Sequence, residues 1–225
     1  MSRRIDLNAD LGESAERWAS GEDVALLDVV TSANICTGAY AGDDTLIAAT
    51  CVAAHERGVA VGAQVGYPDR SGFGRRPMEF SRSGLCMELG RQIAHLNRMA
   101  RKATATVTFV KPHGALYHRV LQDAEQRAAL EAAAGNLPVL GLAGAGFARS
   151  EGFADRGYRP DGTLVPRGED GDLITDPAQA AEQAVRMLDA GVDSICVHSD
   201  SPGALAIAHA VRVALEAAGA EVAHL

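Results

Sequence analysis

Short β-branched segments alternate with helical segments along the whole chain, and this order constrains the fold more than any other feature of the sequence. The predicted strands cover residues 4–8, 29–35, 59–63, 107–110, 138–142, 194–197 and 221–223, and the predicted helices cover residues 44–57, 83–102, 124–134, 177–190 and 203–218. Because strands joined through a helix lie parallel in one sheet, the pattern predicts an α/β fold with a mostly parallel sheet. The pattern alone leaves open whether that sheet closes into a barrel.

Residues that begin helices support this interpretation. Asp176 followed by Pro177 is typical of a helix start, in which a carboxylate caps the first turn and Pro takes the first helical position. Ser201 followed by Pro202 repeats the arrangement, so we expect Ser201 to cap the last helix. The stretch 143–171 is rich in Gly, Arg and Asp, which predicts a long loop region with room for one short strand.

Composition and charge exclude several classes of protein. The 225 residues suit a single domain over residues 1–225, and with only 4% aromatic residues its core must pack through small and aliphatic side chains. No apolar run reaches the ~20 residues of a membrane span, and no apolar segment follows the N-terminal charges, so we expect a cytoplasmic protein. A net charge of −8 argues against nucleic-acid binding. The four cysteines lack CxxC spacing, and we expect free thiols rather than disulfides or a zinc site.

Polar residues follow several predicted strands, at the edge of the sheet where active sites form in parallel α/β folds. Asp10 and Glu13 come after the first strand, and can act as a carboxylate pair in which one is a general base and the other orients a water or a cation. The alternative for Glu13 is that it caps or solvates the start of a helix. Lys111 and His113 follow the fourth strand on either side of Pro112, in extended geometry where alternate residues face one pocket and suit stabilising an oxyanion and moving a proton. The alternative is a surface lysine beside a hydrogen-bonded histidine.

Three further positions carry candidate roles, each with an alternative. His198 can act as a base with Asp200 as its orienting acid, or Asp200 can simply help to cap the next helix. Arg156 can bind a substrate carboxylate or phosphate, or form a structural ion pair with Asp155. Arg75 lies in a Gly-rich basic turn that can contact an anion or remain solvated.

Eight blocks in order resemble the LamB/YcsF family, which is described as the A subunit of bacterial 5-oxoprolinase. They are NADLGE at 8–13, SANI at 32–35, AGD at 41–43, GYPD at 66–69, GFGRR at 72–76, KPHGALY at 111–117, FADR at 153–156 and CVH at 196–198. The resemblance runs from about residue 5 to 222. It implies an irregular (β/α) barrel of the glycoside hydrolase/deacetylase type.

The resemblance also implies an activity, which is the ATP-dependent opening of the lactam 5-oxoproline to L-glutamate together with separate B and C subunits. ATP would be a co-substrate, bound with the partner subunits, and a metal requirement is left open. The expected catalytic residues are Asp10, Glu13, Lys111, His113 and His198. The expected substrate-binding residues are Asn8, Asn34, Tyr40, Gln64, Asp69, Arg75, Asp155 and Arg156.

Two positions depart from the pattern of the family. Members usually carry His where this chain has Tyr40 and Gln64, and neither Tyr nor neutral Gln is a good substitute for an imidazole metal ligand. Ser199 also stands where members carry Gly. The alternative function is therefore a diverged subunit that binds a small carboxylate or serves assembly without turnover, and a third is a metal-dependent, deacetylase-like hydrolase.

Members of the family usually run some tens of residues longer than this chain. We expect the shortfall to lie between residues 144 and 153, where a helix is missing, and again before residue 194. A barrel that lacks a helix on one side exposes apolar surface, so we expect a partner or a homo-oligomer contact there.

Overall fold

The computed structural model describes residues 3–224, which form eight strands and eight α-helices. The strands are β1 (Arg4–Leu11), β2 (Ser32–Cys36), β3 (Ala60–Val65), β4 (Val107–Pro112), β5 (Leu140–Leu142), β6 (Arg149–Phe153), β7 (Ser194–Val197) and β8 (Glu221–Val222). The helices are α1 (Ala15–Ser20), α2 (Glu22–Leu27), α3 (Asp44–Glu56), α4 (Arg82–Lys102), α5 (Gly114–Gln122), α6 (Ala124–Ala134), α7 (Pro177–Ala190) and α8 (Ala204–Ala217), with a 3-10 turn at Arg70–Gly72.

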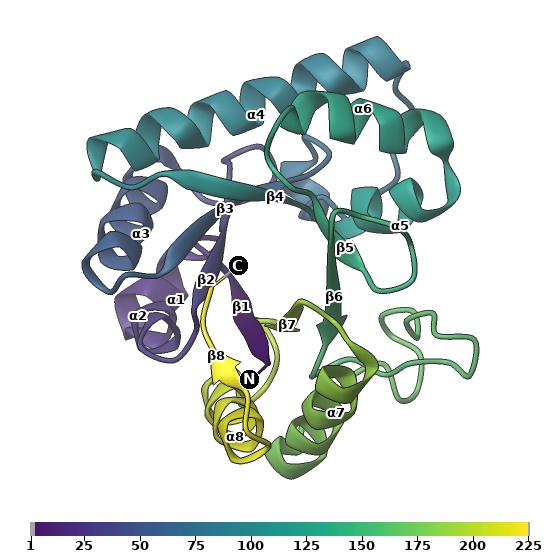
Figure 1. Cartoon of the computed structure of the whole chain (residues 1–225). Coiled ribbons are helices and arrows are strands. Elements are labelled where there is room, and N and C mark those ends of the chain that lie inside the picture. Colours follow the sequence, from purple (N-terminus) through teal and green to yellow (C-terminus); the bar gives the residue numbers. More distant parts are fainter. Residues whose placement is uncertain (1–2, 225) are drawn as a thin grey trace.

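The strands form a nearly closed parallel barrel with helices around it (Figure 1). Their order is β4-β3-β2-β1-β7-β6-β5, and β8 pairs with the beginning of β1. The two ends of this order meet where Val110 bridges Val139 and the Val110 amide donates to the Pro138 carbonyl at 3.0 Å. The predicted α/β barrel is therefore confirmed. Among the described residues, no helix has both the length and the apolar character needed to cross a membrane.

The first strand shows why the barrel has a polar interior. On β1, Asp6, Asn8 and Asp10 alternate with apolar residues, so the polar side chains share one face of the strand. Lys111 on β4 donates to the Asn8 side chain at 3.2 Å, although β4 and β1 are not neighbours. These side chains therefore meet across the inside of the barrel. The apolar residues of β1, such as Leu7, belong to the main hydrophobic core.

Two predicted helix starts have different outcomes. The Asp176 carboxylate accepts from the amides of Ala178 and Gln179, and Pro177 opens α7, as predicted. The prediction for Ser201 was wrong, because α8 begins only at Ala204 and Ser201 makes no cap. The Ser201 hydroxyl donates instead to a buried carboxylate of another loop. Three helices had no prediction: α1, α2 and α5.

The connection between β5 and β6 contains no helix, in agreement with the expected shortfall. Residues 143–148 return directly to the start of β6. The Phe147 ring takes the place that a side chain at Gly141 would fill, because a Cβ there would lie 2.4 Å from the ring. The Arg127 guanidinium lies 4.2 Å from the centre of the same ring and donates to the carbonyls of Ala145 and Gly146. A single aromatic side chain thus covers the position over Gly141.

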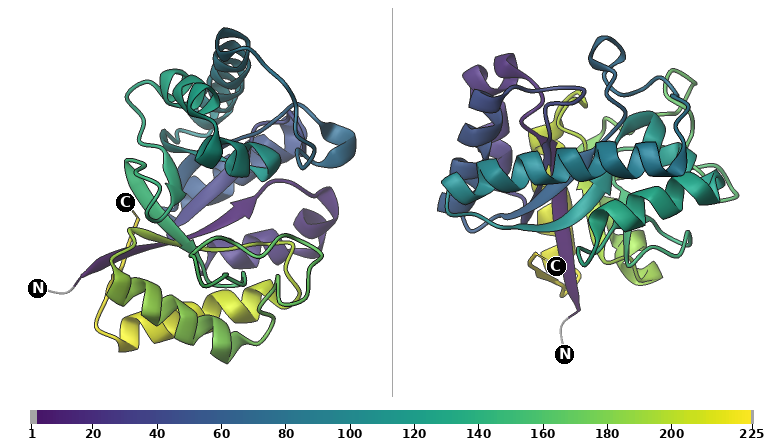
Figure 2. Two further views of the ribbon diagram at one scale, coloured as in Figure 1. Left: turned by 90° about the vertical axis from the view of Figure 1, so that its right-hand side faces the viewer. Right: turned by 90° about the horizontal axis from the view of Figure 1, so that it is seen from above.

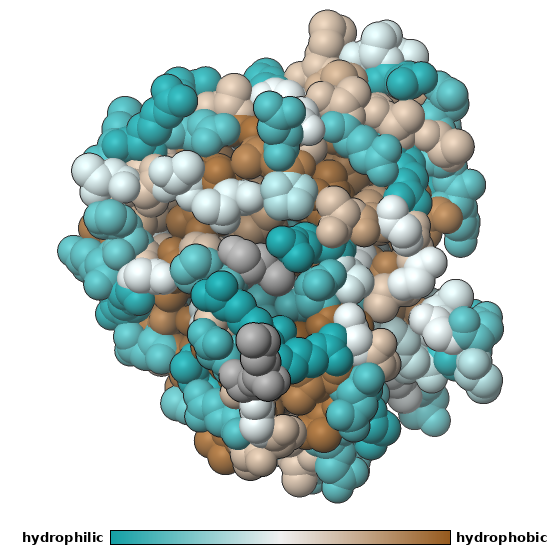
Figure 3. Space-filling model, viewed as in Figure 1, coloured by the Kyte–Doolittle hydropathy of each residue, from teal (hydrophilic) through white to brown (hydrophobic). Residues whose placement is uncertain are grey.

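The loops that follow the strands gather at one end of the barrel. Figure 2 shows the strands running from the N-terminus toward this end, with the loop 154–176 at its side. The opposite end faces the viewer in Figure 1, and on that face apolar residues lie in patches between hydrophilic ones (Figure 3). The carboxyl end of the strands is therefore where the chemistry-bearing residues must be sought.

Candidate functional site

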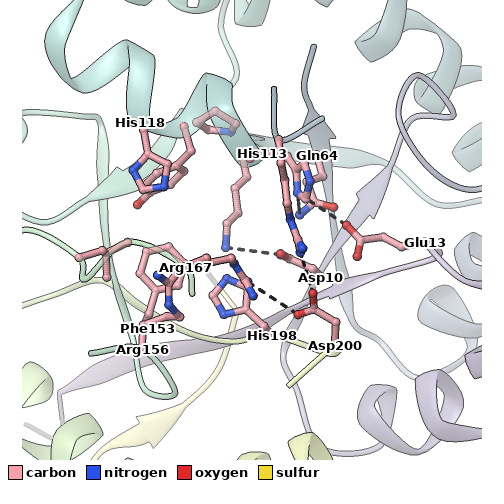
Figure 4. Close-up of a pocket in the computed structure, with 16 residues that line it drawn as sticks. Asp10, Glu13, Gln64, His113, His118, Phe153, Arg156, Arg167, His198 and Asp200 are labelled. Carbon is pink, nitrogen blue, oxygen red and sulfur yellow. Dashed lines mark hydrogen bonds and ion pairs between the residues drawn. The ribbon is translucent and has the colours of Figure 1, made fainter. Parts of the chain in front are cut away.

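A narrow cavity of about 60 Å³ opens among the loops at the carboxyl ends of the strands. Side chains from β1, β4, β6 and the loops after β3 and β7 converge on it (Figure 4). Its lining comprises Asp10, Glu13, Gln64, Arg75, Lys111, Pro112, His113, Gly114, Tyr117, His118, Phe153, Arg156, Leu164, Arg167, His198 and Asp200. All five expected catalytic residues are therefore in this lining.

Lys111 forms the floor of the cavity and is almost fully buried. Its ammonium lies 2.8 Å from Glu151 Oε2 and 3.5 Å from Asp10 Oδ1, and it donates to Cys196 Sγ at 3.1 Å. Burial opposes the charge, but the neighbouring Asp10, Cys196 and Glu151 together raise the pKa of Lys111 well above its usual value. Lys111 is therefore a fixed cation beneath the cavity.

Asp10 is the ionised carboxylate of the site. Burial opposes ionisation, but Lys111, the two site histidines and a hydrogen bond from Asn34 lower the pKa of Asp10 below its usual value. The Asn34 amide donates both to Asp10 Oδ1 at 2.9 Å and to Asn8 Oδ1 at 2.6 Å. Asn8 and Asn34 are outside the cavity lining and orient Asp10 and Lys111 from below.

Glu13 has the opposite electrostatic character. Burial, followed by the charges of Asp10 and Asp200, raises the pKa of Glu13 well above its usual value. Its Oε1 atom is buried without a hydrogen-bond partner and lies 3.7 Å from Nδ1 of His113. Two carboxyl groups in one cavity thus have pKa values shifted apart, which is how active sites separate an acid from a base.

The two positions that depart from the family pattern contact each other. The Tyr40 hydroxyl donates to Gln64 Oε1 at 2.7 Å, and Gln64 Nε2 donates to His113 Nδ1 at 3.3 Å. His113 Nε2–H then donates to the Phe73 carbonyl at 3.0 Å. The chain of hydrogen bonds has one direction, so His113 is neutral with Nδ1 as the acceptor. Burial lowers the pKa of His113 to about 4, in agreement.

His198 is oriented by a different acid from the expected one. The His198 ring donates from Nδ1 to Asp155 Oδ1 at 3.0 Å, and its backbone amide donates to Asp155 Oδ2. The Ser201 hydroxyl also donates to Asp155. The pairing of His198 with Asp200 was therefore wrong, because β6 and β7 are adjacent strands and place Asp155 beside His198. The Phe153 ring stacks on the imidazole at 5.1 Å.

Arginines surround the mouth of the cavity. The Arg75 guanidinium donates to Asp200 at 2.7 Å, and Arg167 lies 3.7 Å from the same carboxylate. Arg156 is committed elsewhere, because it donates to the backbone carbonyls of Val165 and Asp172 and so supports the loop that carries Arg167. No short contact joins Arg156 to the Asp155 carboxylate among the described hydrogen bonds and ion pairs, although the two residues are adjacent.

One predicted residue lies away from the cavity, and three residues in or beside the cavity were not predicted. Asp69 accepts from Arg76 and from the Gly72 amide, so it holds the turn of loop 66–81 rather than lining the cavity. Glu151, Arg167 and Tyr117 were missed. The signal available for Glu151 was its position in a short strand inside the 143–171 stretch, whereas no local pattern distinguishes Arg167 from other loop arginines.

Asp10, Glu13 and His113 offer the best set of metal-donor atoms, all within 4.8 Å of one another. Two carboxylates and an imidazole suit a divalent cation such as Zn²⁺ or Mn²⁺. The Oε1 atom of Glu13, one of the carboxylates in this set, has no hydrogen-bond partner. The Lys111 ammonium, 3.5 Å from Asp10, repels a second cation. The donor atoms therefore fit a divalent metal ion, whereas the positive charge of Lys111 beside them opposes its binding.

The fold and the site define the chain as an α/β barrel with its polar centre at the carboxyl ends of the strands, an architecture shared with deacetylases. A family 4 carbohydrate esterase from Streptomyces lividans superposes with a TM-score of 0.55 at 12% identity, covering 98% of this chain and 91% of that one. Such a likeness concerns the fold alone. The LamB/YcsF family model matches residues 5–225, and the chain belongs to this family.

Similar proteins carry related descriptions. The crystal structure of a lactam utilization protein from Thermus thermophilus superposes with a TM-score of 0.88 at 37% identity, covering 99% of this chain and all of that one. A protein from Streptomyces avermitilis that is named as the A subunit of 5-oxoprolinase is 45% identical over 246 residues, covering 97% of this chain and 98% of the relative. That alignment is longer than the 225 residues of this chain, so this relative has segments that are absent here.

Proposed function

We propose that this chain hydrolyses the lactam bond of 5-oxoproline to give L-glutamate, in an ATP-dependent reaction carried out with partner subunits of the B and C type. The relatives named as the A subunit of 5-oxoprolinase support the substrate and the role within a larger enzyme. The observation that carries the proposal is the placement of a buried cation, Lys111, and an Asp-oriented imidazole, His198, around one small cavity.

Lys111 supplies the electrostatic stabilisation. When water adds to the lactam carbonyl carbon, negative charge develops on the carbonyl oxygen, and an ammonium fixed at the cavity floor stabilises that charge without reorganising. Asp10 and Glu151 hold the ammonium in place from the side of the barrel. ATP, bound with the partner subunits, would first transfer its γ-phosphoryl group to this oxygen and release ADP, because an unstrained amide is a poor electrophile. The phosphoryl oxygens would then carry the negative charge that Lys111 faces, and inorganic phosphate would leave as the carboxylate of glutamate forms.

Two groups move protons in the proposed reaction. His198 donates a hydrogen bond from Nδ1 to Asp155, which leaves Nε2 of His198 free to accept a proton of the attacking water. Burial raises the pKa of Glu13, so Glu13 retains a proton. It can give this proton to the ring nitrogen of the lactam as the carbon–nitrogen bond breaks. Both ring nitrogens of His113 are engaged, by the Gln64 amide and the Phe73 carbonyl, so His113 packs beside Glu13 rather than acting as the base.

Purified chain, combined with B and C subunits and supplied with 5-oxoproline and ATP, should release glutamate, measured by chromatography. A complex with the Streptomyces avermitilis relative serves as the active control. A His198→Asn variant should lose activity by ~10²–10⁴-fold, the usual effect of removing a positioned base. If the relative produces glutamate and this chain produces none, the proposal is wrong.

The second candidate function, carboxylate binding without turnover, is supported by the Tyr40–Gln64 pair. These side chains complete each other's hydrogen bonds and offer no imidazole at the two positions. The double change Tyr40→His with Gln64→His separates the candidates. Activity gained only in the double variant favours the second function, and turnover by the unchanged chain excludes it.

A further inference from the structure

The candidate active cavity is too small for a ring-shaped substrate and adjoins a larger one. Its volume of about 60 Å³ has room for a few water molecules, whereas ligand pockets usually span about 300–1,000 Å³. A groove of about 610 Å³ lies beside it, between α5 and the loop 154–176. The two share five lining residues, which are Arg75, Gly114, His118, Leu164 and Arg167. Displacement of the shared side chains would join the two spaces.

Two residues of this shared wall, Arg75 and Arg167, pair with Asp200, which lines the small cavity. Asp200 accepts from Arg75 at 2.7 Å and lies 3.7 Å from Arg167, and Figure 4 shows Asp200 beside Arg167 at the cavity mouth. The three residues come from three separate loops, 66–81, 154–176 and 198–203. Their side chains are 32–40% exposed, so little stability is lost when these pairs rearrange.

The charges of the cavity place a substrate carboxylate at the mouth rather than at the floor. At the floor, the ammonium of Lys111 already has Asp10 and Glu151 beside it. At the mouth, two guanidinium groups share the single carboxylate of Asp200. In the proposed reaction Lys111 stabilises the charge on the reacting oxygen, so it has no further charge to offer a second anionic group, whereas positive charge is in excess at the mouth.

We propose that Arg75 and Arg167 form the binding site for the carboxylate of a small-molecule substrate, and that the Asp200 side chain occupies this site when no substrate is bound. The identity of the substrate as 5-oxoproline rests on the proposed function. Arginine pairs bind carboxylates through paired N–H donors, and Asp200 presents the same chemical group to the same donors. Substrate binding then exchanges one carboxylate for another and opens the shared wall toward the groove.

Calorimetric titration of the full chain with two matched lactams tests this assignment. 5-Oxoproline carries the carboxylate and 2-pyrrolidinone lacks it. Arg75→Gln and Arg167→Gln should each weaken 5-oxoproline binding about tenfold or more and leave 2-pyrrolidinone binding unchanged. Asp200→Asn should strengthen 5-oxoproline binding, because the internal competitor loses its charge. Arg159→Gln is the control, since Arg159 lines the outer groove and pairs with Glu169.

Three outcomes would overturn the proposal: equal loss of both lactams in the arginine variants, weaker 5-oxoproline binding in Asp200→Asn, or no carboxylate-dependent binding to any variant. Titration with L-glutamate and L-proline extends the test to other small carboxylates. If one of these shows the predicted arginine dependence while 5-oxoproline neither binds nor is hydrolysed, the carboxylate site stands and the proposed function fails.

Discussion

Nζ of Lys111 lies 2.8 Å from Oε2 of Glu151, and both side chains are shielded from water inside the barrel. Burial raises the pKa of the Glu151 carboxyl despite the lysine beside it. Asp10 and Glu151 therefore flank one ammonium from β1 and β6, the two neighbours of β7. This arrangement links the stability of the barrel to the same cation that the proposed reaction uses.

Replacing Lys111 by Met should destabilise the fold by about 3–5 kcal/mol, because a buried carboxylate pair then loses its cation. Glu151→Gln should cost clearly less, since Asp10 still balances Lys111 and a polar amide oxygen can still lie beside the ammonium. Urea unfolding at pH 7 measures both. A Lys111→Met variant within about 1 kcal/mol of the wild-type chain would show that the cation has no structural role.

Glu13→Gln should make stability less dependent on pH. Burial raises the folded-state pKa of Glu13 well above 4.5, its value in an unfolded chain. As the pH rises from 4.5 toward the raised value, the unfolded state loses a proton that the folded state keeps, so the wild-type fold loses stability. The variant lacks this loss. Its free energy of unfolding, measured relative to that of wild type, should therefore be higher at pH 8 than at pH 4. Denaturation of chelator-treated protein at both pH values is the measurement.

A difference between variant and wild type that is the same at pH 4 and pH 8 would contradict the raised pKa of Glu13. Glu16→Gln provides the matched control, because Glu16 lies in the first turn of α1 close to the site in sequence but is exposed.

Tyr40 and Gln64 should be energetically coupled. Tyr40→Phe leaves the buried Gln64 oxygen without its short donor, at a cost of about 1–3 kcal/mol. Once Gln64 is changed to Leu, loss of the hydroxyl should cost much less, so the two effects should not add. A double-mutant cycle by thermal or urea unfolding measures the coupling, and additive effects would refute it.

Asp155→Asn should lower the turnover of the assembled complex by ~10²–10⁴-fold, because Asn does not hold the hydrogen of the His198 ring on Nδ1 as the carboxylate does. Asp28→Asn, on the exposed side of the barrel, should leave turnover unchanged. Circular dichroism must first show that the Asp155→Asn variant is folded, because the Asp155 carboxylate of the unchanged chain also accepts a hydrogen bond from Ser201. An active, folded Asp155→Asn variant would remove His198 from the role of base.

Features that depend on neighbouring residues in the chain could be read from the sequence. Asp176 and Pro177 start α7 because a carboxylate can only cap amides two or three positions away. The alternation of strands and helices predicted a parallel sheet with its polar residues at the carboxyl ends of the strands. Closure of that sheet into a barrel was predicted only by the resemblance to the LamB/YcsF family. The missing helix between β5 and β6 likewise followed from chain length and family resemblance.

Features set by contacts between distant residues were not readable. Ser201 has the local signature of a cap, but its hydroxyl binds Asp155, 46 positions away. Asp200 is two residues from His198, yet its partners are Arg75 and Arg167. Proximity in sequence favoured the wrong acid for His198, because only the adjacency of β6 and β7 shows which carboxylate reaches the ring.

Val110 holds the junction that completes the ring of strands, through a bridge to Val139 in which its amide donates a hydrogen bond to the Pro138 carbonyl. Every other junction in the barrel has a longer ladder, such as the five residue pairs joining β3 to β4. Local unfolding begins where the fewest hydrogen bonds must break, so β4 and β5 should separate first, with fast amide exchange at Val110. Lys111 is the next residue, and each such opening would briefly hydrate its buried ammonium.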